Sequence, residues 1–340
     1  ANVTSNYYNV AIGSMALYSN KTGNSNIAIG YRALYTEGSR GNNFAIGHNA
    51  LQYQSGSSGI SADNTAIGYT AGEDVTTATR LTLVGNAAGV NITTGGYSTM
   101  FGWRVGYNTT TGASNTFIGN MSGYSNTTGY SNTALGGSSM DNGTKASNSV
   151  GIGISALSYL GHTIEKEYAV AIGNLSGQYA TGSYNTFVGG KAGRGGQTSA
   201  PYSSGINNTA IGYQALDSFT TGPGNTAVGV NSLTAVTTGD YNVGLGYNTG
   251  AGLTSGAINV AIGYTALQAD SQGSGTVAIG QQAGLLQNFG AVTTYNTLVG
   301  ANAGNKNLNT GIHFTAIGAN AGHYATGSYN TFVGSSAGRG

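Results

Sequence analysis

The stretch Asn208-Thr-Ala-Ile-Gly-Tyr-Gln-Ala-Leu216 decides the fold, because variants of it recur along the whole chain. The glycine that ends the phrase Asn-Thr-Ala-Ile-Gly can be followed through 19 copies, from Gly13 to Gly334, and 11 of the 18 intervals between copies are 17 residues long. Self-similarity at a short fixed period is the mark of a protein built from stacked units. We call this residue the anchor glycine and count positions in each repeat from it.

The three residues before each anchor glycine predict a short strand. Position −1 is aliphatic or aromatic in all 19 copies, and position −3 is β-branched in all but Phe44. Such residues favour strands, in which alternate side chains share a face. We therefore predict that position −1 forms the buried core, and that the small residues at position −2, such as Ala210 and Ala261, form the opposite face, through which chains pack together. The predicted core isoleucines are Ile12, Ile29, Ile46, Ile67, Ile118, Ile172, Ile211, Ile262, Ile279 and Ile317.

The rest of each repeat predicts one coil of a solenoid. A small residue followed by Leu or Gly at positions +3 and +4 indicates a corner, and a frequent glycine at position +10 indicates a turn, because glycine adopts positive φ without steric cost. The repeat is too short for a propeller blade and has no helical segment. We predict an all-β parallel β-solenoid of about 19 coils.

The array is predicted to be one continuous domain over residues 1–340. The phrase at 179–189 returns at 324–334, which suggests two super-repeats, 57–195 and 203–340. Neither end shows a polar capping unit, and open strand edges are normally covered. We therefore expect the array to belong to a longer fibre.

Position −4 is asparagine in 13 of the 19 copies. Identical amides stacked at the ~4.8 Å spacing of adjacent strands can form a hydrogen-bonded ladder. A row of asparagines that binds a ligand is the alternative interpretation. The column consists of Asn9, Asn26, Asn43, Asn64, Asn115, Asn132, Asn185, Asn208, Asn225, Asn242, Asn259, Asn296 and Asn330.

The composition excludes several classes of protein. Only 6% of the 340 residues are charged, the net charge is +1, 60 residues are Gly and none is Cys. A chain with 39% hydrophobic residues and so little net charge does not resemble a disordered one. The sequence lacks the stripe of basic residues that would predict nucleic-acid binding. It also has no apolar run near the ~20 residues that cross a bilayer. No metal cluster, cofactor motif or catalytic constellation is evident, so we expect a non-catalytic protein without a cofactor.

The longer intervals between anchor glycines predict loops that bulge from the stack and tolerate deletion, at 52–63, 160–168, 195–207 and 285–295. Aromatic residues in or near such loops are candidates for surface contact, because aromatic rings stack on sugars and pack in protein interfaces. Packing between subunits is the alternative role for them. These candidates are Tyr53, Trp103, Tyr202 and Phe289.

The phrase at 208–216, with its Thr-Thr-Gly turn at 220–222, resembles repeats of phage tail fibres and, with a longer period, the Ala-Ile-Gly repeats in head domains of trimeric autotransporter adhesins. The resemblance extends from Asn9 to Gly340. It implies a left-handed parallel β-roll wound by three identical chains and used for attachment.

Together these observations predict a structural fibre or adhesin that mediates attachment to a host cell or surface. The expected location is extracellular, on a virion appendage or a bacterial cell surface. The expected partners are further copies of the chain, as a homotrimer or end to end, and a cell-surface glycan or protein receptor. The alternatives are a monomeric solenoid that binds ice, polysaccharide or matrix, and an extracellular filament subunit. Ice binding is disfavoured because the threonines at position −3 share a face with the isoleucine column that we predict to be buried.

Overall fold

The computed structural model describes residues 7–36, 38–56, 61–161, 168–199, 202–306 and 311–339. The chain divides into two compact units, Ala1–Tyr168 and Ala169–Gly340. Within the described residues each unit is a parallel β-solenoid without a helix, as the repeat predicts. No described helix therefore reaches the length and apolarity that crossing a membrane requires.

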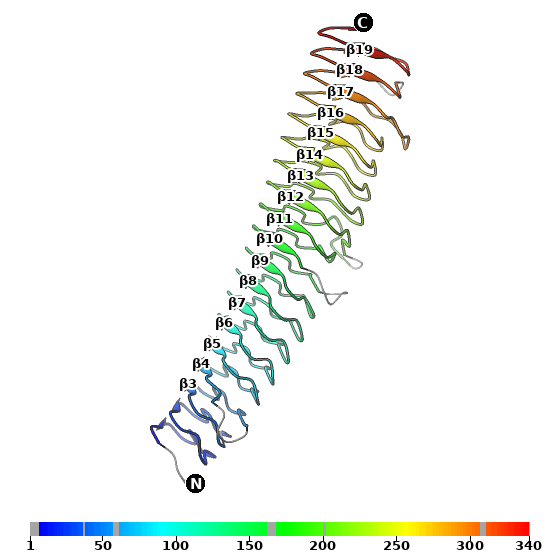
Figure 1. Cartoon of the computed structure of the whole chain (residues 1–340). Helices are drawn as coiled ribbons and strands as arrows, with labels where there is room; N and C mark the ends of the chain where they lie inside the picture. Colours follow the sequence, from blue (N-terminus) through cyan, green and yellow to red (C-terminus); the bar gives the residue numbers. More distant parts are fainter. Residues whose placement is uncertain are drawn as a thin grey trace. The chain divides into compact units, whose positions relative to one another are not determined.

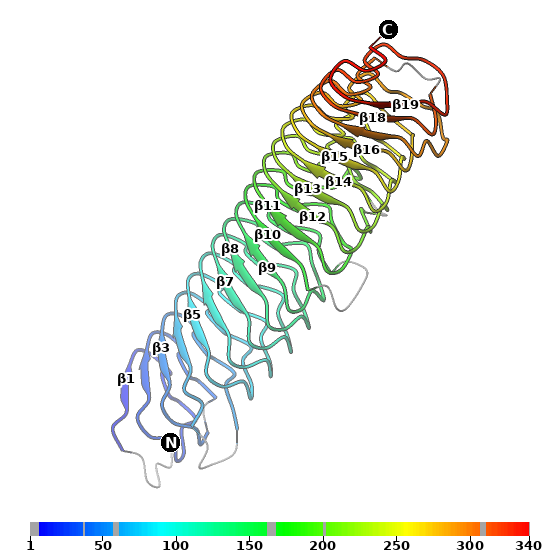
Figure 2. The same ribbon diagram turned by 45° about the horizontal axis from the view of Figure 1, so that its top comes forward.

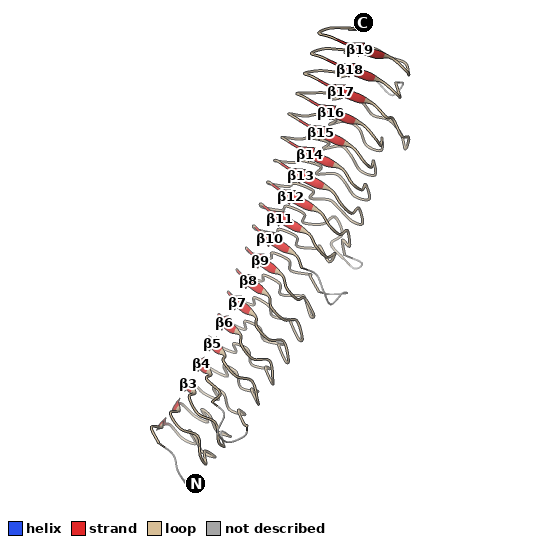
Figure 3. Ribbon diagram, in the orientation of Figure 1, coloured by secondary structure: helices blue, strands red, loops and turns tan. Residues whose placement is uncertain are grey.

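Each coil contributes one strand of three residues, at positions −3 to −1, and the remainder of the coil is loop and turn (Figure 3). In the described part of the first unit the strands are β1 (Val10–Ile12), β2 (Ile27–Ile29), β3 (Phe44–Ile46), β4 (Thr65–Ile67), β5 (Thr82–Val84), β6 (Thr99–Phe101), β7 (Thr116–Ile118), β8 (Thr133–Leu135) and β9 (Val150–Ile152). In the described part of the second unit they are β10 (Val170–Ile172), β11 (Thr186–Val188), β12 (Thr209–Ile211), β13 (Thr226–Val228), β14 (Val243–Leu245), β15 (Val260–Ile262), β16 (Val277–Ile279), β17 (Thr297–Val299), β18 (Thr315–Ile317) and β19 (Thr331–Val333).

Within each unit every strand pairs in parallel with the strands before and after it in sequence, so the coils stack in chain order (Figure 1). The register keeps each position of the repeat over the same position of the next coil. Between β12 and β13, for example, Ala210 lies opposite Ala227 and Ile211 opposite Val228. The turned view in Figure 2 shows the loop and turn segments that close each coil from one strand to the next.

The side chains at position −2 point into the coil, and those at positions −3 and −1 point out. Ala210 and Ala261 are fully buried, whereas Ile211 is 42% exposed. The prediction of an isoleucine core and an alanine contact face is therefore wrong. None of the predicted core residues is buried in a single chain: Ile12, Ile67, Ile172, Ile211 and Ile317 are exposed, and Ile29, Ile46, Ile118, Ile262 and Ile279 are partly exposed.

Positions −2 and +4 share the space inside a coil, and no coil has a large side chain at both of them. Where position +4 is leucine, as at Leu216, position −2 is small, as at Ala210. Where position −2 is large, as at Phe187, position +4 is glycine, and a Cβ at Gly193 would lie 2.2 Å from the Phe187 ring. The thin coil has room for one large side chain from these two positions, and interiors leave few voids. Position −1 stays outside even where both positions are small, as at Ala316 and Gly322 in the coil of Ile317, because the pleat directs alternate side chains to opposite faces.

The anchor glycines stack on one another so closely that no side chain fits. Gly229 has a φ of +127°, and a Cβ there would lie 2.3 Å from the carbonyl oxygen of Gly246 in the next coil. A non-glycine residue is strained at such a φ as well as blocked by the neighbouring backbone.

Three further positions in each coil have left-handed backbone, and many of them are not glycine. In the coil of β12 they are Asn207 (φ +58°), Gln214 (φ +54°) and Leu216 (φ +52°). Their backbone N–H groups donate to neighbouring coils: Gln214 to the Gly190 carbonyl at 3.0 Å and Leu216 to the Ser232 carbonyl at 3.0 Å. The hydrogen bonds between coils hold conformations that the residues themselves disfavour.

Candidate functional site: the outer face of the sheet

The outer face of the sheet consists of the side chains at positions −3 and −1 of every strand. Those at position −3 are threonine, valine, isoleucine or phenylalanine, and those at −1 are isoleucine, valine, leucine or phenylalanine. Several are strongly exposed for aliphatic or aromatic groups, among them Phe101 at 56% and Leu245 at 46%. Because the pleat places every second residue on the same side, the burial of position −2 leaves an apolar strip along each unit.

Two columns of mostly exposed residues, rich in aromatic rings, flank this strip in sequence. Position +1 carries Tyr213, Tyr247 and Tyr264 in the second unit, and position −5 carries Tyr241 and other tyrosines there. Rings at the same position of adjacent coils stack, as in Tyr247 and Tyr264 with centroids 5.5 Å apart. Each unit also has a histidine between two tyrosines: Tyr31, His48 and Tyr69 at position +1, and Tyr295, His313 and Tyr329 at position −5.

Charge is absent from the centre of this face. No Lys, Arg, Asp or Glu occurs at positions −3, −1 or +1 in any repeat. Several cations lie against aromatic rings: the Arg104 guanidinium is 4.7 Å from the centre of the Trp103 ring, and the Arg80 guanidinium is 5.0 Å from that of Tyr97. These contacts place the cations over ring faces.

The four aromatic residues predicted for surface contact differ in their exposure. Tyr53 and Trp103 are exposed, and Tyr202 is partly buried and stacks on Tyr179 with ring centroids 6.4 Å apart. Phe289 is buried, with 3% of its surface exposed, so its assignment to a surface contact is wrong. The insert that contains Phe289 folds back on the stack, where the Thr294 N–H donates to the Ser274 carbonyl at 2.8 Å.

The insert at 195–207 is also joined to the coils beside it. The Gly196 N–H donates to the Phe219 carbonyl at 2.8 Å, and the Thr181 N–H donates to the Ser203 carbonyl at 2.7 Å. These bonds contradict the prediction of a loop that simply bulges from the stack. Deleting 196–204 would therefore remove hydrogen bonds that join neighbouring coils.

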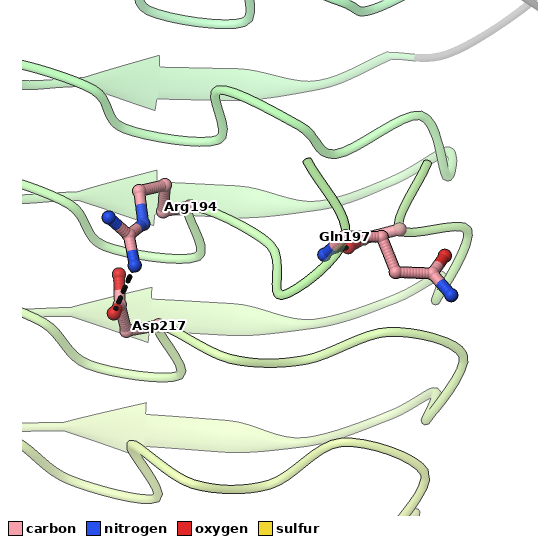
Figure 4. Close-up of polar contacts among 4 residues, drawn as sticks. Arg194, Gln197 and Asp217 are labelled. Atoms are coloured by element: carbon pink, nitrogen blue, oxygen red, sulfur yellow. Dashed lines mark hydrogen bonds and ion pairs between the residues drawn. The ribbon is translucent and has the colours of Figure 1, made fainter. Parts of the chain in front are cut away.

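An ion pair lies at the start of this insert (Figure 4). Arg194 Nη2 is 2.9 Å from Asp217 Oδ2, and Asp217 is almost fully buried. Burial raises the pKa of Asp217, and the positive charges of Arg194 and Lys191 oppose that rise. Gln197 lies further along the insert, away from the pair in this view. The pair has one carboxylate and one guanidinium, with no second acid beside it among the described residues. This is the composition of a structural contact between coils.

The asparagine column at position −4 lies inside the coil and bonds mainly to backbone. Asn225 Oδ1 accepts the Asn242 N–H of the next coil at 3.0 Å, while Asn225 Nδ2 donates to the Gly239 carbonyl of its own coil at 2.9 Å. Direct amide-to-amide bonds occur as well, as from Asn242 Nδ2 to Asn225 Oδ1 at 3.1 Å. Since Asn208, Asn225, Asn242 and Asn259 are fully buried, these amides satisfy backbone groups and do not face solvent.

Acidic groups with perturbed pKa values are distributed over separate coils. Burial raises the pKa of Asp74, Asp141, Asp217 and Asp270. Within the described ranges no three His, Cys, Asp or Glu side chains gather into a group that could hold a metal ion. The feature that distinguishes this surface is thus its apolar strip.

Comparison with known proteins finds no family model, no curated protein and no solved structure that matches this chain.

Proposed function

We propose that the chain is a non-catalytic structural fibre protein for attachment, and that its outer sheet face packs against other copies of the chain in a homotrimer. The proposal places it outside the cell, on a virion appendage or a bacterial surface, with a glycan or protein receptor as its target. The observation that carries it is the uncharged apolar strip along each unit. The contact face is thus the isoleucine face, opposite to the one that the sequence predicts.

The area of the strip and its flanking rings is suited to a protein partner. Aromatic side chains bury about 150–250 Å² each, so a half-exposed tyrosine leaves roughly 100 Å² of ring to cover. Seven exposed tyrosines flank the strip in the second unit: Tyr184, Tyr213, Tyr241, Tyr247, Tyr264, Tyr295 and Tyr329. They alone offer about 700 Å², near the ~800 Å² per partner of a standard stable interface.

Identical chains are the partner that the repeat favours. Because each position recurs in register from coil to coil, two copies of the strip present the same spacing along the strand-stacking direction. A monomeric protein seldom leaves an apolar patch of this size in water. Copies packed through this face would cover side chains such as Ile211 and Leu245, which are half-exposed in one chain.

The test is the mass in solution. The wild-type chain of 34.0 kDa is expected to sediment at three times that mass. The double variant Ile211→Glu with Leu245→Glu places two charges on the strip and is expected to sediment as a folded 34.0 kDa monomer. The control is Leu286→Glu, because Leu286 is a similarly exposed leucine outside the strip. A wild-type monomer, or a double variant that still assembles, would contradict the proposal.

A second candidate function rests on the threonines of the same face. Five consecutive coils, β4 to β8, present threonine at position −3, and these residues lie opposite one another in the sheet. The structure removes the objection that threonine shares a face with a buried column. A monomeric chain could use this regular hydroxyl row to bind an ordered surface such as ice or crystalline polysaccharide. Sedimentation as a monomer, together with thermal hysteresis or polysaccharide retention that Thr99→Lys abolishes, would favour this function.

A further inference from the structure

In the coils of β1 and β7, position +7 holds a buried asparagine whose side chain closes a turn. In the coil of β1 the Gly23 N–H donates to Asn20 Oδ1 at 2.9 Å, and Asn20 Nδ2 donates to the Gly23 carbonyl at 3.1 Å. In the coil of β7, Asn126 Nδ2 donates to the Gly129 carbonyl at 3.1 Å. An asparagine at this position therefore supplies a hydrogen-bond donor to the carbonyl of the turn glycine.

Asp270 occupies the same position in the coil of β15. The Gly273 N–H donates to Asp270 Oδ1 at 2.9 Å, as in the coil of β1. The other carboxyl oxygen, Oδ2, is buried and has no hydrogen-bond partner among the described residues. The carboxylate thus accepts the bond that asparagine accepts but cannot donate the one that asparagine donates.

The glycine carbonyls show which bond is missing. The Gly23 carbonyl accepts two amide donors, from Asn9 and Asn20. The Gly129 carbonyl likewise accepts donors from Asn115 and Asn126. In the coil of β15 the Gly273 carbonyl accepts Asn259 Nδ2 at 2.8 Å, and the second donor position is held by a carboxyl group.

The described coils around Asp270 supply no charged group to balance an ionised carboxylate. It is the only Asp, Glu, Lys, Arg or His in the sequence between Asp240 and Lys306. At the same position of the adjacent coils lie Leu253 and Gln287, both fully buried and uncharged. The tyrosines of this segment, Tyr247, Tyr264 and Tyr295, are exposed on the outer side of the coils.

The free energy of ionisation follows from this environment. Burial raises the pKa of Asp270 to about 6, although the backbone N–H groups of Gly273, Gln272, Phe289 and Ser271 favour the charged form. Desolvation of a buried carboxylate dominates when no cation is near.

We propose that Asp270 is a proton-dependent latch, in which the neutral acid uses its hydroxyl as the donor that asparagine supplies in other coils, and ionisation opens the turn of this coil. The proton is taken from solvent onto Oδ2 and returns to solvent when the latch opens. Mild acid therefore stabilises the turn of this one coil. The latch acts within one chain and does not depend on the oligomeric state.

The sign of the pH dependence follows from proton linkage. The folded-state pKa lies above the unfolded value of 3.8, so the contribution of Asp270 is fully present below about pH 4 and is lost as pH rises through about 6. Between these values unfolding releases one proton from this group, and its unfolding constant rises about tenfold per pH unit.

The experiment compares thermal and denaturant unfolding of the full chain from pH 4 to 8 for the wild type and Asp270→Asn. Asp270→Asn keeps the donor at every pH, so it is expected to remove the share of the rise that Asp270 contributes, about tenfold per pH unit between pH 4 and 6, and to be the more stable protein at pH 8. Asp240→Asn, which removes the same charge at a partly exposed site, is expected to retain the wild-type slope.

Carboxyl ¹³C NMR gives a readout that does not depend on unfolding. One aspartate in the wild type is expected to titrate near pH 6, and this resonance should be missing in Asp270→Asn. A wild type in which no aspartate titrates above pH 5, or an Asp270→Asn variant with the wild-type stability profile, would overturn the latch.

Discussion

Two adjacent glycines in the coil of β8 differ in whether their position requires glycine. Gly136 is an anchor glycine with a φ of +130°, and a Cβ there would lie 2.7 Å from the carbonyl oxygen of Gly153. Gly137, one residue later, has no atom within 4 Å of a Cβ position. The anchor position thus forbids a side chain for both conformational and steric reasons, and its neighbour does not.

We expect Gly136→Ala to destabilise the protein by at least the ~1–3 kcal/mol of a strained backbone position, with the steric contact adding to that cost. Gly137→Ala is the matched control and is expected to change stability by less than about 0.5 kcal/mol, as most surface substitutions do. Denaturant unfolding of both variants measures the difference. Equal stabilities would show that the stacked backbones can separate without cost.

At the scale of the coil, the packing rule is that positions −2 and +4 do not both carry a large side chain. Phe187 fills the interior beside Gly193, whereas in the next coil Leu216 fills it beside Ala210. Leu216 shows that leucine adopts the left-handed backbone at position +4, since its φ of +52° equals that of Gly193. The two arrangements should therefore be interchangeable within one coil.

We expect Phe187→Ala to cost about 3–5 kcal/mol through the cavity that it leaves, and Gly193→Leu to be destabilising because its Cβ meets the Phe187 ring. The double variant reproduces the coil of β12 and is expected to recover much of both losses. A double-mutant cycle in denaturant measures this coupling. Phe187→Ala combined with Gly304→Leu, six coils away along the chain, is the control and should be additive. Additivity in the Phe187 and Gly193 pair would refute the packing rule.

The strand positions could be predicted from the sequence, and their orientation could not. The strands lie at positions −3 to −1, where β-branched residues and the anchor glycine place them. The alternation of side chains along a strand places Ile211 and Ala210 on opposite faces, but it does not predict which face is buried. Hydrophobicity favours the isoleucine, and the narrow interior of a coil already occupied by Leu216 favours the alanine. The left-handed conformations at Gln214 and Leu216 have no sequence signal, because hydrogen bonds from neighbouring coils impose them.

Across the whole chain, buried acids predict an unusual dependence of stability on pH. Burial raises the pKa of Asp74, Asp141, Asp217 and Asp270. A folded-state pKa above the unfolded one means that unfolding releases protons, so the contribution of these groups is full below about pH 4 and falls as pH rises through their folded-state values. We expect the melting temperature to fall between pH 4 and pH 7, with Asp270, at a pKa of about 6, extending the decline furthest. Calorimetry over this range measures it, and a melting temperature that rises with pH would contradict the assignment.

The repeat, its register, the all-β class and the absence of charge from the strand columns could all be predicted from the amino-acid sequence, because they depend on local residue types that recur in order. The asparagines at position −4 of 13 copies could be located in the same way. The tertiary structure decided which face of the strand is buried, since that depends on the volume enclosed by a closed coil and not on the strand alone. The packing of neighbouring coils likewise buries Phe289 and Asp270, which no local pattern of residues predicts. The outer face proposed for assembly follows from the same choice: once position −2 points into the coil, the pleat leaves the side chains at position −1 outside.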